Sequence, residues 1–511
     1  MSKNSRTIIN VACSVAVMAT NLVISFVLSP YIVKHIGVEA NGFVTLANNF
    51  VAYAQLITAS LNSMAARYIT IEYVRKDYKK ANIYYNSVFW GNLIIVAVLI
   101  IPAAVLIAKL ENFVNVPVEL LTDVKLLFSF VFFNFFLTTG VPNWQGAYIA
   151  NRLDRTYIPQ MATSVFNCLA LFTLFIIFAP HVWYVGFTSS LVTIISVMVS
   201  WYNTYKLTPQ LKVQLSPKKI ICSWAAIKEL VGSGIWNSIS SVGNMLLSGL
   251  DLLICNLMLG ATDMGIISLS KTLPNFMQQL SSSIRGAFAP ELTINYAKGD
   301  KEAVFKDLNR AMKLTSVVMT IPIAGIVVLG DRFFSLWVPS QDAKLLQTLS
   351  ILAILGYMFT SGTQILYNVF PTVNKVKQNS IAMIISGMVS TVMVLLLAKF
   401  TNYGIYAVAG VSTFVNLCRN MIFTVPFTAK YLGFKWNKFF PQVITTVVSS
   451  VLLIGLGMLI KPLLPQGSWL MFFVSAAIVG IIGLMVNFTL VLKKEERNYL
   501  IGIIRSKISR K

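Results

Sequence analysis

The sequence predicts an all-α polytopic membrane protein with about fourteen transmembrane helices. Three observations predict this fold. The 511 residues are 56% hydrophobic and 12% charged, apolar runs of about 20 residues recur along the whole chain, and the basic residues gather between these runs. A soluble domain carries roughly 25% charged residues, and a helix needs about 20 apolar residues to span a bilayer.

The first apolar segment is predicted to be a helix that stays in the protein. Lys3 and Arg6 precede it, as in a signal peptide, but it is longer than a signal h-region and no clear cleavage site ends it. Thirteen more segments follow. The fourteen segments cover residues 7–29, 41–64, 86–108, 124–143, 157–179, 182–202, 229–257, 264–286, 311–330, 345–368, 379–398, 404–425, 439–460 and 468–492.

The positions of the basic residues predict the orientation. With a cytoplasmic N-terminus, 32 of the 41 lysines and arginines fall at the cytoplasmic ends and loops and 7 fall outside. Cytoplasmic loops of membrane proteins carry this excess. We therefore expect both termini in the cytoplasm, and we attribute the net charge of +23 to these loops rather than to nucleic-acid binding.

Cysteine and histidine usage argues against a metal or a cofactor. The five cysteines form no CxxC pair and lie in or beside apolar segments, and the chain has two histidines, His35 and His181. We expect buried free thiols, no disulfide, no metal and no cofactor.

An internal repeat divides the chain. A shift of 223 aligns 37–77 with 260–300 without a gap and gives ten identities in 41 positions, which indicates a repeated unit. Six helices per copy predict two parallel halves, related by an axis along the membrane normal. The expected parts are an N-lobe at 1–205, a cytoplasmic linker at 206–228, a C-lobe at 229–428, two further helices at 429–492 and a basic cytoplasmic tail at 493–511.

Polar residues inside both copies of the second helix predict a cavity. Polar groups that face lipid are costly, so we expect a polar cavity between segments 7–29, 41–64, 229–257 and 264–286. The alternative is that small polar residues only hold helices together. The candidate amides are Asn48, Asn49, Gln55, Asn275 and Gln278.

The repeated block resembles a known family. The stretches LSPYIVKHIGVEANGFVTL from Leu28 and ARYIT from Ala66 resemble the first helical hairpin of bacterial polysaccharide repeat-unit flippases. The second copy, GLDLLICNLMLGATDMGIISLSKTLPNF from Gly249 and FAPELTINYAKGDKEAV from Phe288, resembles the seventh and eighth helices of the same family. These are the O-antigen and capsule flippases of the multidrug/oligosaccharidyl-lipid/polysaccharide exporter superfamily.

The resemblance implies alternating access by two lobes in a bacterial plasma membrane. The implied cargo is an oligosaccharide on undecaprenyl pyrophosphate, and the implied partners are membrane lipids, a polysaccharide polymerase and glycosyltransferases. A pyrophosphate inside a membrane needs cations. Lys271 and Arg419 are predicted well inside helices, and Arg67 and Arg285 at cytoplasmic helix ends, where snorkelling to the interface is the alternative role.

Asp251 and Lys271 are predicted to form an ion pair. Each lies ten residues from a turn near Ala261, so they reach the same depth on antiparallel helices. A lone charge there would be costly. The pair is either structural, or Lys271 leaves Asp251 to meet the pyrophosphate while Asp251 takes a proton or sodium ion. No partner carboxylate for sodium occurs in 379–398 or 404–425.

Three other functions fit parts of the sequence. A cation-coupled multidrug exporter would use cavity carboxylates, and here Asp251 is the one acidic residue deep in a predicted helix. A lipid II flippase would share the fold. A membrane glycosyltransferase, ligase or polymerase would need acid/base residues in its outer loops, and the longest one, about 109–123, offers Glu111, Glu119 and Asp123 without a clustered motif.

The predicted topology can be tested by cysteine labelling in intact cells. A cysteine introduced near Asn112 should react with a membrane-impermeant maleimide, because 109–123 is expected outside the membrane. A cysteine near Asp300 should react only after the cells are permeabilised. The reverse labelling pattern would contradict the topology.

Overall fold

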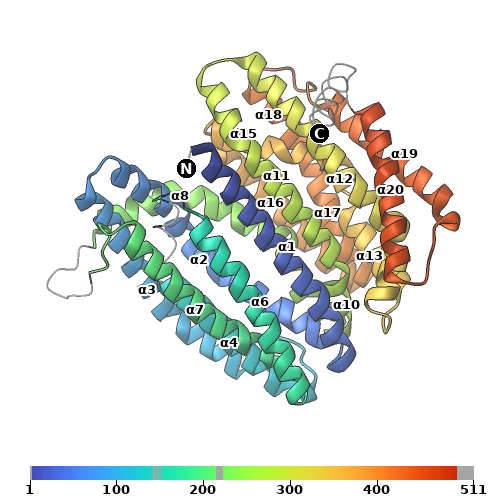
Figure 1. The fold of residues 1–511 in the computed structure, drawn as a ribbon, viewed down its shortest axis with the longest axis horizontal. Helices are drawn as coiled ribbons and strands as arrows, with labels where there is room; N and C mark the ends of the chain where they lie inside the picture. Colours follow the sequence, from blue (N-terminus) through green and yellow to red (C-terminus); the bar gives the residue numbers. More distant parts are fainter. Residues whose placement is uncertain (1–2, 142–145, 147–148, 151, 215–221, 492–511) are drawn as a thin grey trace, which may run out of the picture. The chain divides into compact units, whose positions relative to one another are not determined.

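The computed structural model describes residues 3–141, 146, 149–150, 152–214 and 222–491. This part of the chain is almost entirely helical and contains no strand (Figure 1). The contacts divide the chain into two compact units: Met1–Met245 with Leu252–Ser268, and Leu246–Asp251 with Leu269–Lys511. The fold class predicted from the sequence is confirmed.

The first unit contains the N-terminal helices and part of the second repeat. The helix α8 packs here against α2 and α3, although it begins the second repeat. Short 3-10 turns at Leu110–Asn112 and Val118–Leu120 connect α3 to α4. The helices are α1 (Lys3–His35), α2 (Val38–Val74), α3 (Tyr78–Ala108), α4 (Leu121–Gly140), α6 (Asp154–Ile177), α7 (Trp183–Leu207) and α8 (Trp224–Asn244), with most of α9 (Asp251–Leu259) and α10 (Ala261–Ser270).

The second unit contains several helices that are interrupted. A π-helical turn, η4 (Met245–Gly249), precedes α9, and another, η6 (Asn420–Thr424), follows α17. A 3-10 stretch, η5 (Gly362–Asn368), interrupts the helix that starts with α13. The other helices are α11 (Thr272–Ala297), α12 (Lys301–Trp337), α13 (Ala343–Ile354), α14 (Tyr357–Thr360), α15 (Val369–Thr372), α16 (Val376–Phe400), α17 (Gly404–Arg419), α18 (Val425–Tyr431), α19 (Phe440–Ile460) and α20 (Trp469–Leu490).

Twelve stretches of the described residues are long and apolar enough to cross a membrane. Each of the fourteen predicted segments falls on helical structure, but α2 and the α10–α11 stretch are not among the twelve. These are the two copies of the helix in which the sequence places its amide residues, and those residues lower the hydropathy. The count of fourteen transmembrane helices therefore stays a prediction.

The repeat is visible in the backbone of the turn between its first two helices. Gly37 and Gly260 both have positive φ, 126° and 108°. The amide of Gly37 donates to the Ile32 carbonyl, and that of Gly260 to the Cys255 carbonyl, each at 3.1 Å. The donor and the acceptor of the second bond each lie 223 positions after those of the first, so the two copies share one helix–turn–helix geometry.

The next turn also agrees between the copies. Asp77 caps α3 by accepting the Lys80 amide at 3.0 Å, and Asp300 caps α12 by accepting the Ala303 amide at 2.9 Å. A side chain that accepts a backbone N–H at a helix start satisfies a group with no partner in the helix. The aligned aspartates at the end of the repeated block therefore have the same role, since each caps the helix that follows it.

Residues related by the repeat also contact one another inside the first unit. A Cβ built on Gly42 would lie 3.0 Å from Gly265 Cα, and one on Gly265 would lie 2.3 Å from the Val38 carbonyl oxygen. Small residues let helix backbones approach this closely in membranes. Three pairs displaced by 223 positions meet along α2 and α10: Glu39 with Thr262 at 2.7 Å, Gly42 with Gly265, and Thr45 with Ser268 at 3.1 Å.

The two C-terminal helices belong to the second unit. Both α19 and α20, red in Figure 1, pack on α12. Inside the span, Asn487 donates to Thr320 at 2.9 Å and accepts from Ser449 at 2.7 Å, so one buried amide joins all three helices. The predicted basic tail, 493–511, lies outside the described residues, as do 215–221 of the predicted linker.

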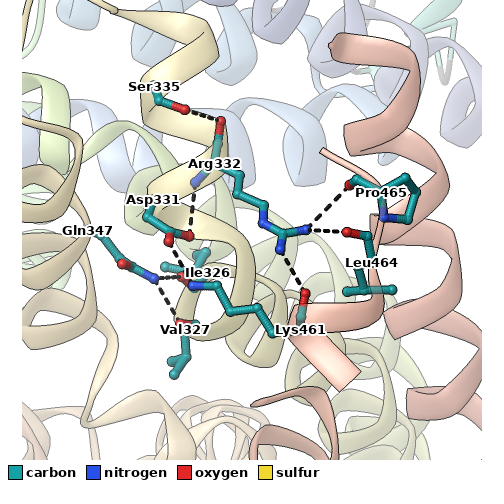
Figure 2. A network of polar contacts seen from close by, with 9 residues as sticks. All are labelled: Ile326, Val327, Asp331, Arg332, Ser335, Gln347, Lys461, Leu464 and Pro465. Atoms are coloured by element: carbon teal, nitrogen blue, oxygen red, sulfur yellow. Dashed lines mark hydrogen bonds and ion pairs between the residues drawn. The ribbon is translucent and has the colours of Figure 1, made fainter. Parts of the chain in front are cut away.

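A polar network at one end of α12 holds the α19–α20 connection (Figure 2). Lys461 pairs with Asp331 at 2.7 Å, and the Arg332 guanidinium donates to the carbonyls of Lys461 at 2.7 Å and Leu464 at 3.2 Å. Carbonyls at the end of α19 have no partner within their own helix. The arginine therefore satisfies them and fixes the two helices to α12.

The glycine contact gives a stability test. Gly265→Ala should destabilise the protein by about 1–3 kcal/mol, because the new methyl group overlaps the Val38 carbonyl. Gly286→Ala in α11 is the control. A Cβ added at Gly286 would have no neighbouring atom within 4 Å, so this substitution should be neutral or should stabilise the protein by up to about 1 kcal/mol. Thermal unfolding of the purified proteins in detergent measures both. Equal stability of the two variants would contradict the close contact.

Candidate functional site

The ion pair predicted between Asp251 and Lys271 is present in the second unit. Asp251 is 3% exposed and binds the Lys271 ammonium directly. Ser412 of α17 also donates to the Asp251 carboxylate, at 3.4 Å. The turn between the two charged residues lies at Gly260, next to the predicted centre at Ala261. The pairing is therefore confirmed, whereas its role in transport stays a prediction.

Two helix interruptions place these charged side chains. The π-helical turn η4 precedes Asp251, and its Leu246 and Leu247 carbonyls accept hydrogen bonds from Thr391 at 2.7 Å and Ser390 at 3.0 Å. These hydroxyls come from α16 and hold the π-helical turn by tertiary contact. Single π-helical turns inside helices occur often at functional sites.

Lys271 occupies the break between α10 and α11. Pro274 has no N–H, so the Ser270 carbonyl has no donor four residues ahead. Ser350 of α13 supplies one, donating to that carbonyl at 2.7 Å. The break is therefore stabilised by tertiary contact, and it holds Lys271 between two helical segments, as the discontinuous helices of transporters hold their binding groups.

Arg419 is a buried cation of the same unit, with 6% of its surface exposed. Its guanidinium donates to the Tyr367 hydroxyl, to Asn416 Oδ1 at 2.7 Å and to Met383 Sδ at 3.1 Å. Within the described residues Nε has no hydrogen-bond partner, and none of the printed partners of Arg419 is a carboxylate. Its positive charge is therefore left without a counter-charge there.

Tyr367 brings a second arginine to the same place. The Arg285 guanidinium carbon lies 5.7 Å from the Tyr367 ring centre, and that of Arg419 lies 5.2 Å from it. The 3-10 stretch η5 carries this tyrosine, whose hydroxyl donates to Asn420 at 2.7 Å. Sequence analysis missed Tyr367. The one feature of the sequence that could have indicated it is its polar hydroxyl inside the apolar segment 345–368.

The ion pair and Arg419 lie along one face of α17. Ser412, which touches Asp251, and Arg419 are seven residues apart in the regular part of this helix. Seven residues are about two turns, so the two side chains share a face and are about 10 Å apart along the axis. The second unit thus carries two cationic positions on one helix face.

Two predicted helix ends, at 64 and 286, are wrong, because α2 continues to Val74 and α11 to Ala297. The helix α2 has 37 residues, about 55 Å against a bilayer core of about 30 Å. Arg67 therefore lies within α2, exposed, and Arg285 lies within α11 rather than at its end. Because α12 begins at Lys301, Lys313 lies well inside this helix, where it is buried.

The predicted amides separate into two groups. Asn48 and Gln55 line a pocket in the first unit together with side chains of α4 and α7. Asn49 is half-buried outside that pocket lining, and Asn275 and Gln278 are exposed on α11. Sequence analysis missed Asn134, Thr138 and Ser189 as pocket residues.

Two of the three acids that were predicted in an outer loop, Glu111 and Asp123, are held in structural contacts. Glu111 pairs with Lys125 at 2.7 Å, and this hydrogen bond lowers the pKa of the Glu111 carboxyl. Asp123 lies 3.0 Å from His181 Nδ1 and accepts the Val182 amide at 3.2 Å. A carboxylate with a lowered pKa is a poor proton donor at neutral pH, so Glu111 does not suit acid catalysis.

No metal centre is formed by the part of the chain that the structure describes. No group of three or more histidine, cysteine, aspartate or glutamate side chains could hold an ion in these residues. The five cysteines are free, but burial as predicted holds for Cys255 alone: Cys13, Cys168 and Cys418 are half-buried, and Cys222, which precedes α8, is exposed.

The fold is that of a multi-pass membrane transporter. It matches an inward-facing multidrug resistance MATE family transporter of the MOP superfamily with a TM-score of 0.64 and 13% identity, over 85% of this chain and 95% of that chain. It matches the lipid II flippase MurJ, in an inward closed conformation, with a TM-score of 0.66 and 13% identity, over 93% and 97% of the two chains.

The chain belongs to the polysaccharide biosynthesis protein family, whose model matches residues 9–295. The uncharacterized membrane protein EpsK of Bacillus subtilis (strain 168) is 28% identical over 499 residues, which cover 97% of this chain and 98% of EpsK. The family links the chain to polysaccharide biosynthesis, and its fold is shared with a MATE transporter and a lipid II flippase.

The ion pair gives a second stability test. Lys271→Met should destabilise the protein by about 3–5 kcal/mol, because Asp251 is left buried without a counter-charge. The double variant Asp251→Asn, Lys271→Met should recover most of this loss. Thermal unfolding in detergent is the measurement, and Lys399→Met on the exposed end of α16 is the control, expected within about 0.5 kcal/mol of the wild type. A single variant as stable as the double one would refute the pairing argument.

Proposed function

We propose that this protein is a flippase for a polyprenyl-pyrophosphate-linked oligosaccharide. It moves its cargo by alternating access from the inner to the outer leaflet of a bacterial plasma membrane, with both termini in the cytoplasm. The family supports a role in polysaccharide biosynthesis, and the fold supports transport. The lipid-linked cargo and the membrane are our inference.

The observation that carries this proposal is the uncompensated charge of Arg419. An arginine that is buried in a membrane protein without a carboxylate partner is costly, so it is retained where an anion is bound. Guanidinium groups bind phosphate oxygens with two parallel hydrogen bonds. Arg285, which also lies against the Tyr367 ring, adds a second positive charge to the same place.

A multidrug exporter for organic cations is less well supported. Such a cargo needs a carboxylate that is available inside the membrane. The buried carboxylates of the described residues are Asp251 and Glu72, and each is paired, with Lys271 and with Lys80 at 3.1 Å. The charge that lacks a partner is therefore positive and favours an anionic cargo.

The membrane potential helps to drive an anionic head group outward. An inside-negative potential contributes about 2.3 kcal/mol per charge per 100 mV. A pyrophosphate therefore gains free energy on moving to the outer leaflet, and coupling to protons or sodium is not required. A polysaccharide polymerase and glycosyltransferases are the expected partners, because they consume and supply such a cargo.

Deletion and complementation test this function. Deleting the gene should abolish a surface polysaccharide while lipid-linked repeat units still form inside the cell. Wild-type protein and Arg310→Gln, which changes an exposed arginine of α12, should restore the polysaccharide. Arg419→Gln at matched expression should restore at least tenfold less, because two phosphate hydrogen bonds are lost.

Other deletion phenotypes would identify other functions. A change in drug tolerance alone would favour the exporter, and loss of viability with arrested peptidoglycan synthesis would favour a lipid II flippase. Full complementation by Arg419→Gln would show that the anion site is not at this arginine.

A further inference from the structure

A polar pocket in the first unit lies among α2, α4 and α7. Its volume is about 170 Å³, which is smaller than the roughly 300–1,000 Å³ of sites for drug-sized ligands. One wall is apolar and includes Val131 and Phe135. None of its lining residues carries a charge, and its polar ones are Asn48, Gln55, Asn134, Thr138 and Ser189.

An unsatisfied acceptor stands in this pocket. Asn134 Oδ1 is buried and has no hydrogen-bond partner within the described residues. Buried polar atoms without partners are costly and usually bind water or a ligand. Thr138 donates to the backbone carbonyl of Asn134 at 2.8 Å, which leaves the side-chain oxygen of Asn134 without a donor from the described residues. The side-chain amides of Asn48 and Gln55 offer both N–H donors and carbonyl acceptors. The pocket can therefore bind a molecule that both donates and accepts.

The pocket is the first repeat's counterpart of the charged site in the second. Within the gapless alignment, Asn48 corresponds to Lys271. Asp251, at the same displacement of 223, corresponds to Leu28. The ion pair of one repeat is thus replaced by an amide and an apolar side chain in the other.

A third position of the two sites also corresponds. In α7, Ser190 donates to the Phe130 carbonyl at 3.5 Å, and in α17, Thr413 donates to the Ala353 carbonyl at 2.8 Å. Both ends of these bonds are displaced by 223. Ser189 directly precedes Ser190, and Ser412 directly precedes Thr413. The pocket residue Ser189 therefore corresponds to Ser412, which binds Asp251. Both sites thus have a serine hydroxyl at this position, whereas the charged pair occurs in the second repeat and not at the corresponding positions of the first.

We propose that this pocket binds one uncharged sugar ring of the glycan, through Asn134, Thr138 and Asn48. The inference rests on the proposed function and assigns a second binding position to it. Neutral amides and a hydroxyl cannot compensate a pyrophosphate, but they match the hydroxyl and acetamido groups of a sugar. Apolar lining side chains such as Val131 and Phe135 match the C–H face of a pyranose ring, and the volume of about 170 Å³ suits one ring.

Binding to two probes tests this subsite in the full-length protein in lipid nanodiscs. The probes are a polyprenyl pyrophosphate and the same lipid carrying one N-acetylglucosamine. The wild type should bind the sugar-bearing probe about tenfold more tightly, because several hydrogen bonds are added. Asn134→Leu and the isosteric Thr138→Val should each reduce this ratio by about threefold to tenfold. Their affinity for the bare probe should stay unchanged.

Thr173→Val is the matched control. Thr173 in α6 is exposed and donates to the carbonyl four residues before it at 2.8 Å, as Thr138 does. This variant should change neither affinity. Arg419→Gln should weaken both probes alike, because the proposed function assigns the pyrophosphate to this arginine.

The outcomes separate the two proposals. If the wild type binds both probes equally, or if neither pocket variant lowers the ratio, the pocket does not bind the sugar, while the proposed function stands. If the wild type binds neither probe, the proposed cargo itself is wrong. An unchanged affinity for the bare probe shows that a variant is folded, so a lowered ratio then supports the subsite.

Discussion

The bilayer core supplies no water to hydrogen-bond with the backbone, so a helix can break there only where another part of the protein replaces the lost partner. This constraint explains how the charged site of the second unit exists. The carbonyl freed by Pro274 accepts a hydrogen bond from Ser350, and Ser390 and Thr391 bind the carbonyls of the π-helical turn before Asp251. Without the Ser350 hydroxyl the break that carries Lys271 would leave a carbonyl without a partner.

The same constraint explains how the C-terminal helices are attached. Asn487 of α20 lies fully buried and binds Thr320 of α12 and Ser449 of α19. At the end of these helices, Arg332 satisfies the carbonyls of the α19–α20 connection. A polar contact at two depths resists both sliding and rotation, so these helices form one body with α12.

The two repeats have kept their geometry and diverged in chemistry. Their turns share positive-φ glycines and aspartate caps, because these features determine how the chain reverses direction. Their binding positions differ, with Asn48 in one copy and Lys271 in the other. The proposed cargo, a charged head group with a neutral glycan, is itself asymmetric, so the two unlike half-sites that we propose match it better than two identical ones.

The sequence by itself determined the properties that depend on composition and spacing. Hydropathy gave the helical membrane fold, the 223-residue shift gave the repeat, and equal distances from a turn gave the Asp251–Lys271 pair, because a helix rises by a fixed length per residue. The tertiary structure alone decided which polar groups lack partners. Arg419, Arg285 and Tyr367 come from three helices whose packing no local pattern encodes. Asn134 reads in the sequence as one more amide in an apolar segment. Only the packing of α2, α4 and α7 leaves its oxygen unsatisfied beside a cavity.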